Sequence, residues 1–346
     1  MARSETLVLG TGFGGLTVAT RLAQQGHRVR CLGNGTPGAS LRNFGQLHSG
    51  AVYAPVLPDL AAACRDHRSR WLPLLGPDVA RTPCVGLFDD PAAVAAYTHA
   101  WDCLRIPAQP LAPADLPALG LSQTDASAAA FLLPDMAVDV TALHAKTRRH
   151  AKEEGVLLAP EESYTLVRSG NSAVLANTAN CFRLAESVVL SAGHHTPRLL
   201  DLLGIEHPLS VSHLPYAVLE GSRPGFPLTY RLDGDLLAVS PQDDGLHVAL
   251  PGRSEGPRSE AAEQYRLAAA LSHRWPHLPA ERLAMRWGLV AEITGDRPDP
   301  AVTVVDLRDP PPGWGDADNL VVCLPGKWTT AWHAADRVAE VLSPPR

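Results

Sequence analysis

The segment Thr6-Leu7-Val8-Leu9-Gly10-Thr11-Gly12-Phe13-Gly14-Gly15 decides the fold. Its first four residues are apolar or β-branched and predict a buried parallel strand. The residues from Leu16 to Gln25 carry apolar side chains at helical spacing and predict a helix. A glycine-rich turn that leaves a strand and opens a helix is typical of a dinucleotide-binding domain.

The glycines of this turn have separate tasks. Gly10 permits the tight turn, Gly12 lets the backbone approach a pyrophosphate, and Gly15 lets the helix pack closely on the strand. The start of the helix offers N–H groups and a partial positive charge to the phosphates. The alternative is a plain strand-to-helix turn without a ligand. The predicted cofactor contacts here are Gly10, Gly12, Phe13, Gly14 and Gly15.

The next predicted strand, residues 27–32, lacks an expected acid at its end. In dinucleotide-binding domains this acid holds the ribose hydroxyls. Here the position is Gly33, followed by Asn34, whose amide would bind a diol without charge assistance. Either the site makes room for the 2′-phosphate of NADP, with Arg28 or Arg30 nearby, or it holds its dinucleotide more weakly.

Composition argues against several classes of protein, including nucleic-acid-binding and membrane-spanning proteins. The 346 residues include 45% hydrophobic residues, enough for two domains with a sizeable core. A net charge of −6 without a long basic run argues against a nucleic-acid partner. No apolar stretch has membrane-spanning length, and the first strand begins too early for a signal peptide. With six scattered cysteines and no C-x-x-C pair, we expect a cytoplasmic protein with reduced thiols and no metal site.

The order of predicted elements indicates an α/β protein. Strand–helix patterns occupy the start, middle and end of the chain, including helices at 139–155 and 327–342 and a buried strand at 185–193. Strand-rich segments lie between them, and residues 107–117 are Pro-rich and predicted irregular. We also predict a helix at 91–104, a strand at 128–133 and a small hairpin around Gly170-Asn171. We therefore predict a discontinuous Rossmann-like nucleotide-binding domain interleaved with a mostly antiparallel α+β substrate domain. The predicted bounds are 1–78, 135–205 and 286–346 for the first domain, and 79–134 and 206–285 for the second.

Three further motifs carry a resemblance to a known family. Residues 42–50, Arg-Asn-Phe-Gly-Gln-Leu-His-Ser-Gly, are similar to the R-N-x-G-x-x-H-S-G segment of glycerol-3-phosphate dehydrogenases and L-2-hydroxyglutarate oxidases. Residues 188–193 look like the family's V-N-A-A-G strand and turn. Residues 325–330, Pro-Gly-Lys-Trp-Thr-Thr, resemble a G-G-K-W-T-T turn. The chain thus resembles the D-amino-acid oxidase (DAO) superfamily of FAD-dependent oxidoreductases over nearly its whole length.

The chain departs from the family pattern at several points. Gly33 replaces the ribose-binding acid, Pro325 replaces a glycine, and Ala331-Trp332 replace a tyrosine and an arginine. The chain is also shorter than the glycerol-phosphate enzymes. The resemblance nevertheless implies FAD as the cofactor. It adds these predicted cofactor contacts to the first turn: Asn34, Ser40, Arg42, Asn43, Gly45, Gln46, Leu47, Ala192, Gly193, Gly326, Lys327, Trp328 and Thr329.

The resemblance also suggests three catalytic candidates, each with alternatives. His48 would accept a substrate proton as hydride leaves, or carry a covalent link to the flavin 8α carbon, or only shape its loop. Lys327, at the start of the closing helix, would place a charge by the reduced flavin or an anionic substrate, or point into solvent. Arg297 would grip a carboxylate or phosphate, or form a surface ion pair.

Several other polar and aromatic residues could belong either to a site or to the ordinary structure. Tyr53, Tyr216 and Tyr230 are candidate pocket walls, or simply core. His194 and His195 would point in different directions on an extended chain, so a shared metal site is disfavoured. No nucleophile elbow is present, which argues against a hydrolase.

The sequence therefore predicts an FAD-dependent oxidoreductase. It would transfer hydride from a carbon bearing a hydroxyl to flavin N5, with O2 or an unidentified acceptor reoxidising the cofactor. The substrate would be a small polar alcohol, hydroxy acid or sugar or polyol derivative, possibly phosphorylated. Alternatives are an amine or amino-acid oxidase, an NADP-binding reductase and a non-catalytic flavoprotein.

Overall fold

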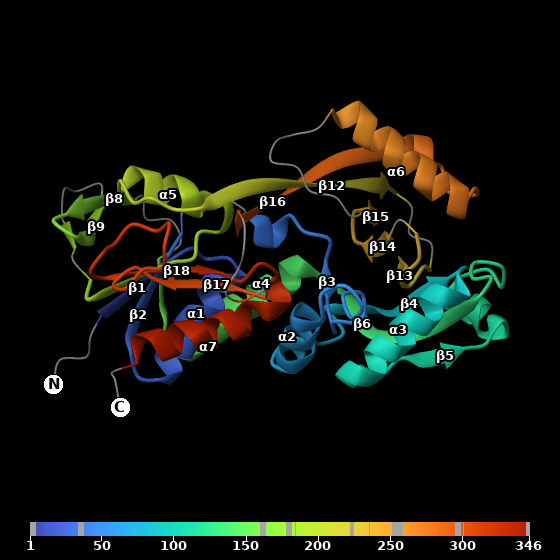
Figure 1. Ribbon diagram of the computed structural model, residues 1–346, viewed down its shortest axis with the longest axis horizontal. Helices are drawn as coiled ribbons and strands as arrows, with labels where there is room; N and C mark the ends of the chain where they lie inside the picture. Colours follow the sequence, from blue (N-terminus) through green and yellow to red (C-terminus); the bar gives the residue numbers. More distant parts are fainter. Residues whose placement is uncertain are drawn as a thin grey trace. The chain divides into compact units, whose positions relative to one another are not determined.

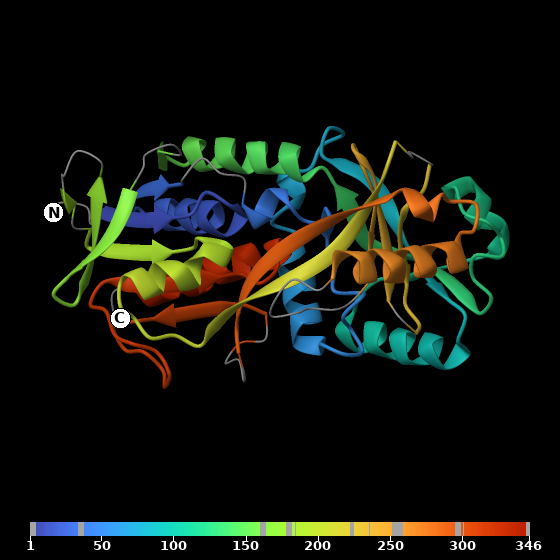
Figure 2. The same ribbon diagram turned by 90° about the horizontal axis from the view of Figure 1, so that it is seen from above.

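The computed structural model groups the chain into two compact units (Figures 1 and 2). The first unit comprises residues 1–42, 144–212 and 289–346, and the second comprises residues 43–143 and 213–288. The predicted division into an FAD-binding and a substrate domain stays a prediction. The structure describes residues 5–33, 38–159, 164–177, 182–183, 185–221, 225–234, 236–250, 259–294, 299 and 301–343.

The first unit is built on a six-stranded, mainly parallel sheet. Strand β1 pairs in parallel with β2 on one side and β11 on the other, and only β17 runs antiparallel to its neighbour β18. This arrangement confirms the predicted α/β fold class. In sheet order the strands are β17 (Thr303–Asp306), β18 (Leu320–Leu324), β11 (Ser187–Leu190), β1 (Glu5–Leu9), β2 (Arg28–Leu32) and β7 (Leu157–Ala159).

Two helices from opposite ends of the chain pack side by side in this unit. They are α1 (Phe13–Gln24) and α7 (Ala331–Leu342), drawn in blue and red in Figure 1. The Thr17 hydroxyl donates to the carbonyl of Ala331 at 3.1 Å, and Arg21 pairs with Asp336 at 2.8 Å. The other helices are α4 (Val140–Glu153) and α5 (Thr196–Leu202).

A small antiparallel sheet accompanies the first one. Strands β8 (Tyr164–Ser169) and β9 (Ser172–Asn177) form a hairpin around Gly170-Asn171, and β10 (Phe182–Arg183) pairs with β9. This hairpin confirms the turn that the sequence predicted there.

The larger sheet has nine strands, most of which lie in the second unit. Of the strand pairings whose register is described, all are antiparallel except that β13 runs parallel to β4. Along the sheet the strands are β16 (Leu283–Ile293), β12 (Leu209–Glu220), β15 (Gly245–Ala249), β14 (Leu237–Gln242), β13 (Leu228–Arg231), β4 (Ala80–Phe88), β6 (Ala129–Val138) and β3 (Gln46–Leu47), with β5 (Gln109–Leu111) beside β6.

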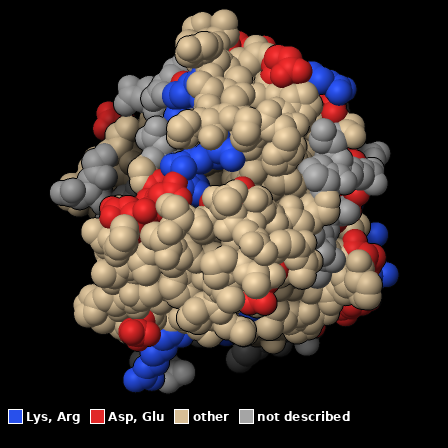
Figure 3. Space-filling view, turned by 90° about the vertical axis from the view of Figure 1, so that its right-hand side faces the viewer, with Lys and Arg blue, Asp and Glu red and all other residues tan. Residues whose placement is uncertain are grey.

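Helices and aromatic side chains complete the second unit. The helices are α2 (Pro58–Arg68), α3 (Pro91–Leu104) and α6 (Glu260–Arg274). Trp101 of α3 packs edge-on against Phe88 and Phe131 in one core cluster. On the face drawn in Figure 3, charged residues form small groups that mix both signs, and among the described residues neither sign forms an extended patch there.

Several local predictions were wrong. The closing helix begins not at Lys327 but as a 3-10 turn over Trp328–Thr330, and α7 follows from Ala331. Residues 107–117 are not irregular throughout, because β5 and a 3-10 helix (Pro113–Leu119) include part of them. His194 and His195 lie in a 3-10 turn (Gly193–His195), not on extended chain.

Candidate functional site

The glycine-rich turn of the first unit leaves no room for side chains. Gly10 has a φ of 125°, and a Cβ there would lie 2.1 Å from the carbonyl oxygen of Ser191. A Cβ on Gly15 would lie 1.7 Å from the carbonyl oxygen of Gly10. The turn therefore brings bare backbone to the start of α1, which fits the pyrophosphate of a dinucleotide.

Ser40 lies beside this turn. Its Oγ accepts the backbone N–H of Phe13 at 3.0 Å, and a Cβ on Gly12 would lie 2.6 Å from that Oγ. The Ser40 hydroxyl thus occupies the start of α1, where oriented N–H groups attract anions. The cofactor contact predicted for Ser40 stays a prediction.

Two further predicted turns lie next to the first one. A Cβ on Gly14 would lie 2.9 Å from the Ser191 hydroxyl and 3.0 Å from Pro325 Cγ. The ring centroids of Phe13 and Trp328 are 5.3 Å apart. The first unit therefore brings together the turns at 10–15, 191–193 and 325–329, which are far apart in the sequence.

Lys327 is the residue that precedes the 3-10 turn at the end of this cluster, and it is partly buried. Thr330 caps the turn locally, since its hydroxyl donates to the carbonyls of Pro325 at 2.6 Å and Lys327 at 2.9 Å. The start of the 3-10 turn and α7 thus lies by the glycine-rich turn, as the family pattern suggests.

The structure shows what lies next to Gly33, where the family has the ribose-binding acid. A Cβ on Gly33 would lie 2.3 Å from Thr11 Oγ1, so the Thr11 side chain occupies the space that an acidic side chain would need. Thr11 also has its carbonyl within 2.7 Å of His144 Nε2. Asn34, the predicted substitute for the acid, lies outside the described residues.

The rings of the two histidines after Gly193 lie close together at a tilt of 39°, contrary to the prediction that they diverge. Their ring centroids are 4.0 Å apart, because the 3-10 turn places consecutive side chains closer in direction than an extended strand does. Burial lowers the pKa of His194 to about 4, with smaller contributions from the charges of His195 and Arg42. Within the described part of the chain, no group of three His, Cys, Asp or Glu residues could hold a metal.

In the second unit, the segment after Arg42 forms a tight turn that leads into β3. The Asn43 side-chain oxygen accepts the N–H of Gly45 at 2.8 Å, and Gly45 has a φ of 68°. A Cβ on Gly45 would lie 2.8 Å from the carbonyl oxygen of Val138, so this backbone passes very close to β6.

Gln46 follows this turn with its side chain buried. Only 8% of the residue is exposed, and its Nε2 has no hydrogen-bond partner among the described residues. A buried amide donor without a protein partner is costly, so a water or a ligand must meet it. This observation supports the predicted cofactor contact of Gln46.

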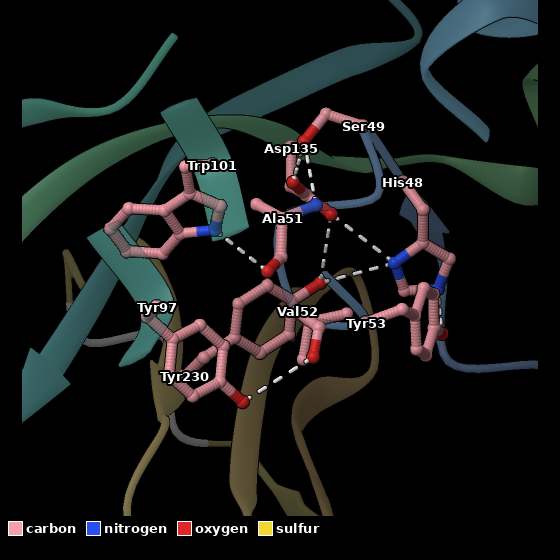
Figure 4. Close-up of polar contacts among 9 residues, drawn as sticks. All are labelled: His48, Ser49, Ala51, Val52, Tyr53, Tyr97, Trp101, Asp135 and Tyr230. Carbon is pink, nitrogen blue, oxygen red and sulfur yellow. Dashed lines mark hydrogen bonds and ion pairs between the residues drawn. The ribbon is translucent and has the colours of Figure 1, made fainter. Parts of the chain in front are cut away.

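His48 meets a carboxylate that the sequence analysis did not identify. Strands β3 and β6 pair Gln46 with Ala137 and Leu47 with Met136, so the next positions along this register are His48 and Asp135. His48 Nδ1 lies 3.2 Å from Asp135 Oδ1 (Figure 4). Opposite β4 the register of β6 shifts between Leu133 and Met136, which leaves Asp135 at a β-bulge. Bulges of this kind commonly redirect a side chain next to a functional site.

Hydroxyl groups surround this pair (Figure 4). The Ser49 hydroxyl donates to Asp135 Oδ2, and Tyr230 Oη lies 3.5 Å from Asp135 Oδ1. Burial, and next the charge of Asp135, raises the pKa of Tyr230 well above its usual value, so this phenol keeps its proton. On the other side of the ring, Tyr53 Oη lies 3.1 Å from His48 Nε2.

His48 and Asp135 are both largely buried from solvent. The Asp135 side chain has 0% exposure and that of His48 has 11%. A buried carboxylate beside an imidazole is an arrangement that can orient a base and stabilise its protonated form. The cluster of Asp135, His48, Ser49, Tyr53 and Tyr230 is called the His48 cluster below.

The predicted site residues therefore divide between the two units. Gly10 to Gly15, Ser40, Arg42, Ala192, Gly193 and Gly326 to Thr329 belong to the first unit, and Asn43 to His48 belong to the second. Arg297 lies outside the described residues. Sequence reasoning missed Asp135 and Ser49, and the available signal was Pro134, because a proline inside a strand pattern suggests a bulge.

Comparisons with known proteins agree with this geometry. Residues 5–341 match the family model described as FAD dependent oxidoreductase (DAO). No curated protein matches the chain. None of the helices in the described residues has both the length and the apolar character needed to cross a membrane.

Solved structures share the fold at low sequence identity. Iminodiacetate oxidase from Chelativorans sp. BNC1 is 19% identical with a TM-score of 0.71, and the match covers 97% of this chain and 95% of that one. Glycine oxidase from Geobacillus kaustophilus is 18% identical with a TM-score of 0.68, covering 98% and 94%. L-alpha-glycerophosphate oxidase from Mycoplasma pneumoniae, with FAD bound, is 14% identical with a TM-score of 0.70, covering 100% and 96%.

Proposed function

The chain belongs to the FAD-dependent oxidoreductase (DAO) family, and from this premise we propose that it oxidises a carbon bearing a hydroxyl. The substrate class is a small polar alcohol, hydroxy acid or sugar or polyol derivative, possibly phosphorylated. O2 or another, unidentified acceptor takes the electrons afterwards.

The observation that carries the choice of an alcohol is the buried contact between His48 and Asp135. An alcohol O–H is a very weak acid, so its proton must pass to a base as hydride leaves the carbon. An amine can instead bind in its neutral form and release hydride with the help of its own lone pair. An imidazole hydrogen-bonded to a buried carboxylate at 3.2 Å supplies the base that an alcohol needs.

The cofactor FAD would accept the electrons in this reaction. FAD, when bound, supplies the two-electron acceptor, at flavin N5. The turn at 10–15 and the Ser40 hydroxyl would hold its pyrophosphate. Lys327 would place a positive charge by the start of the last helix.

Amine or amino-acid oxidation is the second candidate. It is supported by the names of two structural neighbours, an iminodiacetate oxidase and a glycine oxidase. Because these neighbours are less than 25% identical to this chain, they support its fold only. The choice of substrate therefore depends on the residues of the site.

Matched substrate pairs test the proposal. Purified holoenzyme is mixed anaerobically with hydroxy compounds and with the amines that carry nitrogen at the same carbon, and the oxidised flavin band is followed. We expect a hydroxy compound to bleach the band while its amine twin does not. Bleaching by the amines alone would assign the chain to amine oxidation.

A further inference from the structure

We propose that the Thr11 hydroxyl binds the adenosine ribose of FAD, in the place of the acid that Gly33 replaces. His144 is the positioning residue that holds Thr11 there. This inference concerns how the first unit binds its cofactor, so its test is independent of the proposed oxidation of an alcohol.

The end of β2 lies directly beside the glycine-rich turn. Strands β1 and β2 run in parallel with Leu9 opposite Leu32, so their carboxyl ends meet at one edge of the sheet. The N–H of Gly10 donates to the carbonyl of Leu32 at 2.7 Å, which joins the turn to the residue before Gly33. In dinucleotide-binding domains, the end of the second strand meets the adenosine ribose when the pyrophosphate lies on the turn.

The Thr11 side chain supplies the polar group at this place. A Cβ added to Gly33 would lie 2.3 Å from Thr11 Oγ1 and 2.9 Å from Thr11 Cγ2. Both distances are shorter than a normal contact, so Thr11 occupies the volume in which an acidic side chain of residue 33 would begin. The first unit thus exchanges a carboxylate at the end of β2 for a hydroxyl on the turn.

The Thr11 hydroxyl differs from the two threonine hydroxyls of α1, which bond within the helix. The Thr17 hydroxyl donates to the carbonyl of Phe13 at 2.9 Å, and the Thr20 hydroxyl donates to that of Leu16 at 2.7 Å. Among the described residues, the Thr11 hydroxyl has no hydrogen-bond partner, and Thr11 is only partly buried. A hydroxyl has one donor hydrogen and two acceptor lone pairs, so it can both donate to and accept from a ribose diol.

His144 of α4 holds the backbone of Thr11. Its Nε2 lies 2.7 Å from the Thr11 carbonyl oxygen, and because a carbonyl only accepts, this nitrogen carries the ring proton. The Phe13 ring packs edge-on against the imidazole, with centroids 5.5 Å apart. Burial lowers the pKa of His144 and outweighs the opposing effect of the bond to Thr11, so the imidazole is neutral at neutral pH. A neutral donor between Phe13 and Thr11 therefore fixes the residue whose hydroxyl meets the ribose.

The test combines cofactor analogues with variants of the full chain. Each variant is freed of flavin, its fold is checked by circular dichroism, and it is titrated by fluorescence with FAD and with FAD analogues that lack the adenosine 2′- or 3′-hydroxyl. Thr11→Val removes the hydroxyl, and Thr11→Ser keeps it. Thr20→Val is the matched control, because it removes a buried hydroxyl that bonds to the carbonyl of Leu16.

We expect the wild type to bind one of the two analogues about 3–10-fold more weakly than FAD, the usual effect of losing one hydrogen bond. Thr11→Val should bind FAD with that lower affinity and no longer distinguish FAD from the analogue. Thr11→Ser and Thr20→Val should distinguish them as the wild type does. A wild type that binds all three ligands alike would overturn the proposal. So would discrimination by the wild-type factor in Thr11→Val, because the hydroxyl would then not contact the ribose.

The positioning role of His144 has its own readout. His144→Leu removes the donor to the Thr11 carbonyl and should reduce the discrimination between FAD and the deoxy analogue. His144→Gln carries an amide that can donate to the same carbonyl, so it should restore part of the discrimination. Wild-type discrimination in His144→Leu would overturn this role.

The alternative for the end of β2 is a 2′-phosphate, as in NADP-binding domains. Displacement of bound FAD by NADP⁺ and by NAD⁺ separates the two possibilities. We expect NADP⁺ to displace no more FAD than NAD⁺ does, because Thr11 fills the space beside Gly33. Displacement by NADP⁺ alone would overturn the proposal.

Discussion

The turn at residues 10–15 and the His48 cluster are built by different means. The turn is made of backbone, and its geometry depends on Cβ atoms that are absent, as at Gly15. The cluster is made of side chains from β6, from β13 and from the segment that follows β3, and its polar contacts include three at 3.1 to 3.5 Å. The first can be read from six consecutive residues, whereas the second depends on strand pairing across 87 positions. We therefore expect the turn at 10–15 to tolerate no added side-chain volume. We expect the His48 cluster to tolerate substitutions of equal volume, but not those that change which atoms carry protons.

Gly15→Ala is expected to have the largest effect. Its methyl group would lie 1.7 Å from the carbonyl oxygen of Gly10, so β1 and α1 must separate. We expect loss of bound FAD and a destabilisation of about 1–3 kcal/mol, typical of overpacking. FAD content after purification and urea unfolding measure both.

The matched control for this change is Gly38→Ala. Gly38 has a φ of −85°, and a methyl group added there would meet no heavy atom within 4 Å, so this variant should keep FAD and stability. If Gly15→Ala retained as much FAD as Gly38→Ala, the backbone description of the turn would be wrong.

Asp135→Asn tests the His48 cluster without changing its volume. The amide nitrogen can donate to His48 Nδ1, which would move the ring proton to Nε2 and remove its lone pair from Tyr53. We expect flavin reduction to slow by about 10²–10⁴-fold with FAD content unchanged. Stopped-flow absorbance under anaerobic conditions provides the rate. A variant that lost FAD together with activity would show that Asp135 serves structure and not positioning.

Substitutions at Gly33 test whether an acidic side chain can be added to the glycine-rich backbone site. We expect Gly33→Glu to weaken FAD binding, because its Cβ would lie 2.3 Å from Thr11 Oγ1. Adding Thr11→Gly makes room, and the carboxylate should then tighten binding about tenfold through charge-assisted bonds to the ribose. Fluorescence titration with FAD compares the double variant with Thr11→Gly alone. Tighter binding by Gly33→Glu on its own would show that Thr11 does not block this position.

His194 should give the smallest effect. Its pKa falls from 6.5 to about 4 on folding, so between these values the unfolded chain binds a proton that the folded chain does not. Stability should therefore fall as the pH falls through this window, by about 1 kcal/mol after allowing for solvent screening of a partly exposed ring. His194→Asn should flatten the pH dependence of the unfolding free energy. Parallel curves for wild type and variant would contradict this assignment.

Predictions from the sequence succeeded where the determinants are local. The bounds of α3 agree with the predicted helix at 91–104, because Asp90 caps it and Pro91 suits its first position. The parallel neighbours β11, β1 and β2 also follow from local strand and helix patterns.

Predictions failed where distant segments decide the structure. The strand that the sequence predicts from Ala128 ends at Leu133. In the structure β6 continues through a bulge to Val138, and this continuation carries Asp135 to His48. The close contact between the His194 and His195 rings was not predicted because a 3-10 turn has no strong sequence pattern over three residues.

The place of β18 in its sheet has a consequence for how this chain forms during synthesis. Residues 320–324 fill the gap between β11 and β17, and α7 comes later still to cover α1. The second unit is complete in sequence by residue 288, so a ribosome releases everything it needs well before the first unit can close. Until then β11 presents an open, apolar strand edge, the kind of surface that recruits chaperones or a neighbouring chain. A nascent chain that has emerged from the ribosome as far as residue 315 would thus combine one complete unit with one exposed strand edge.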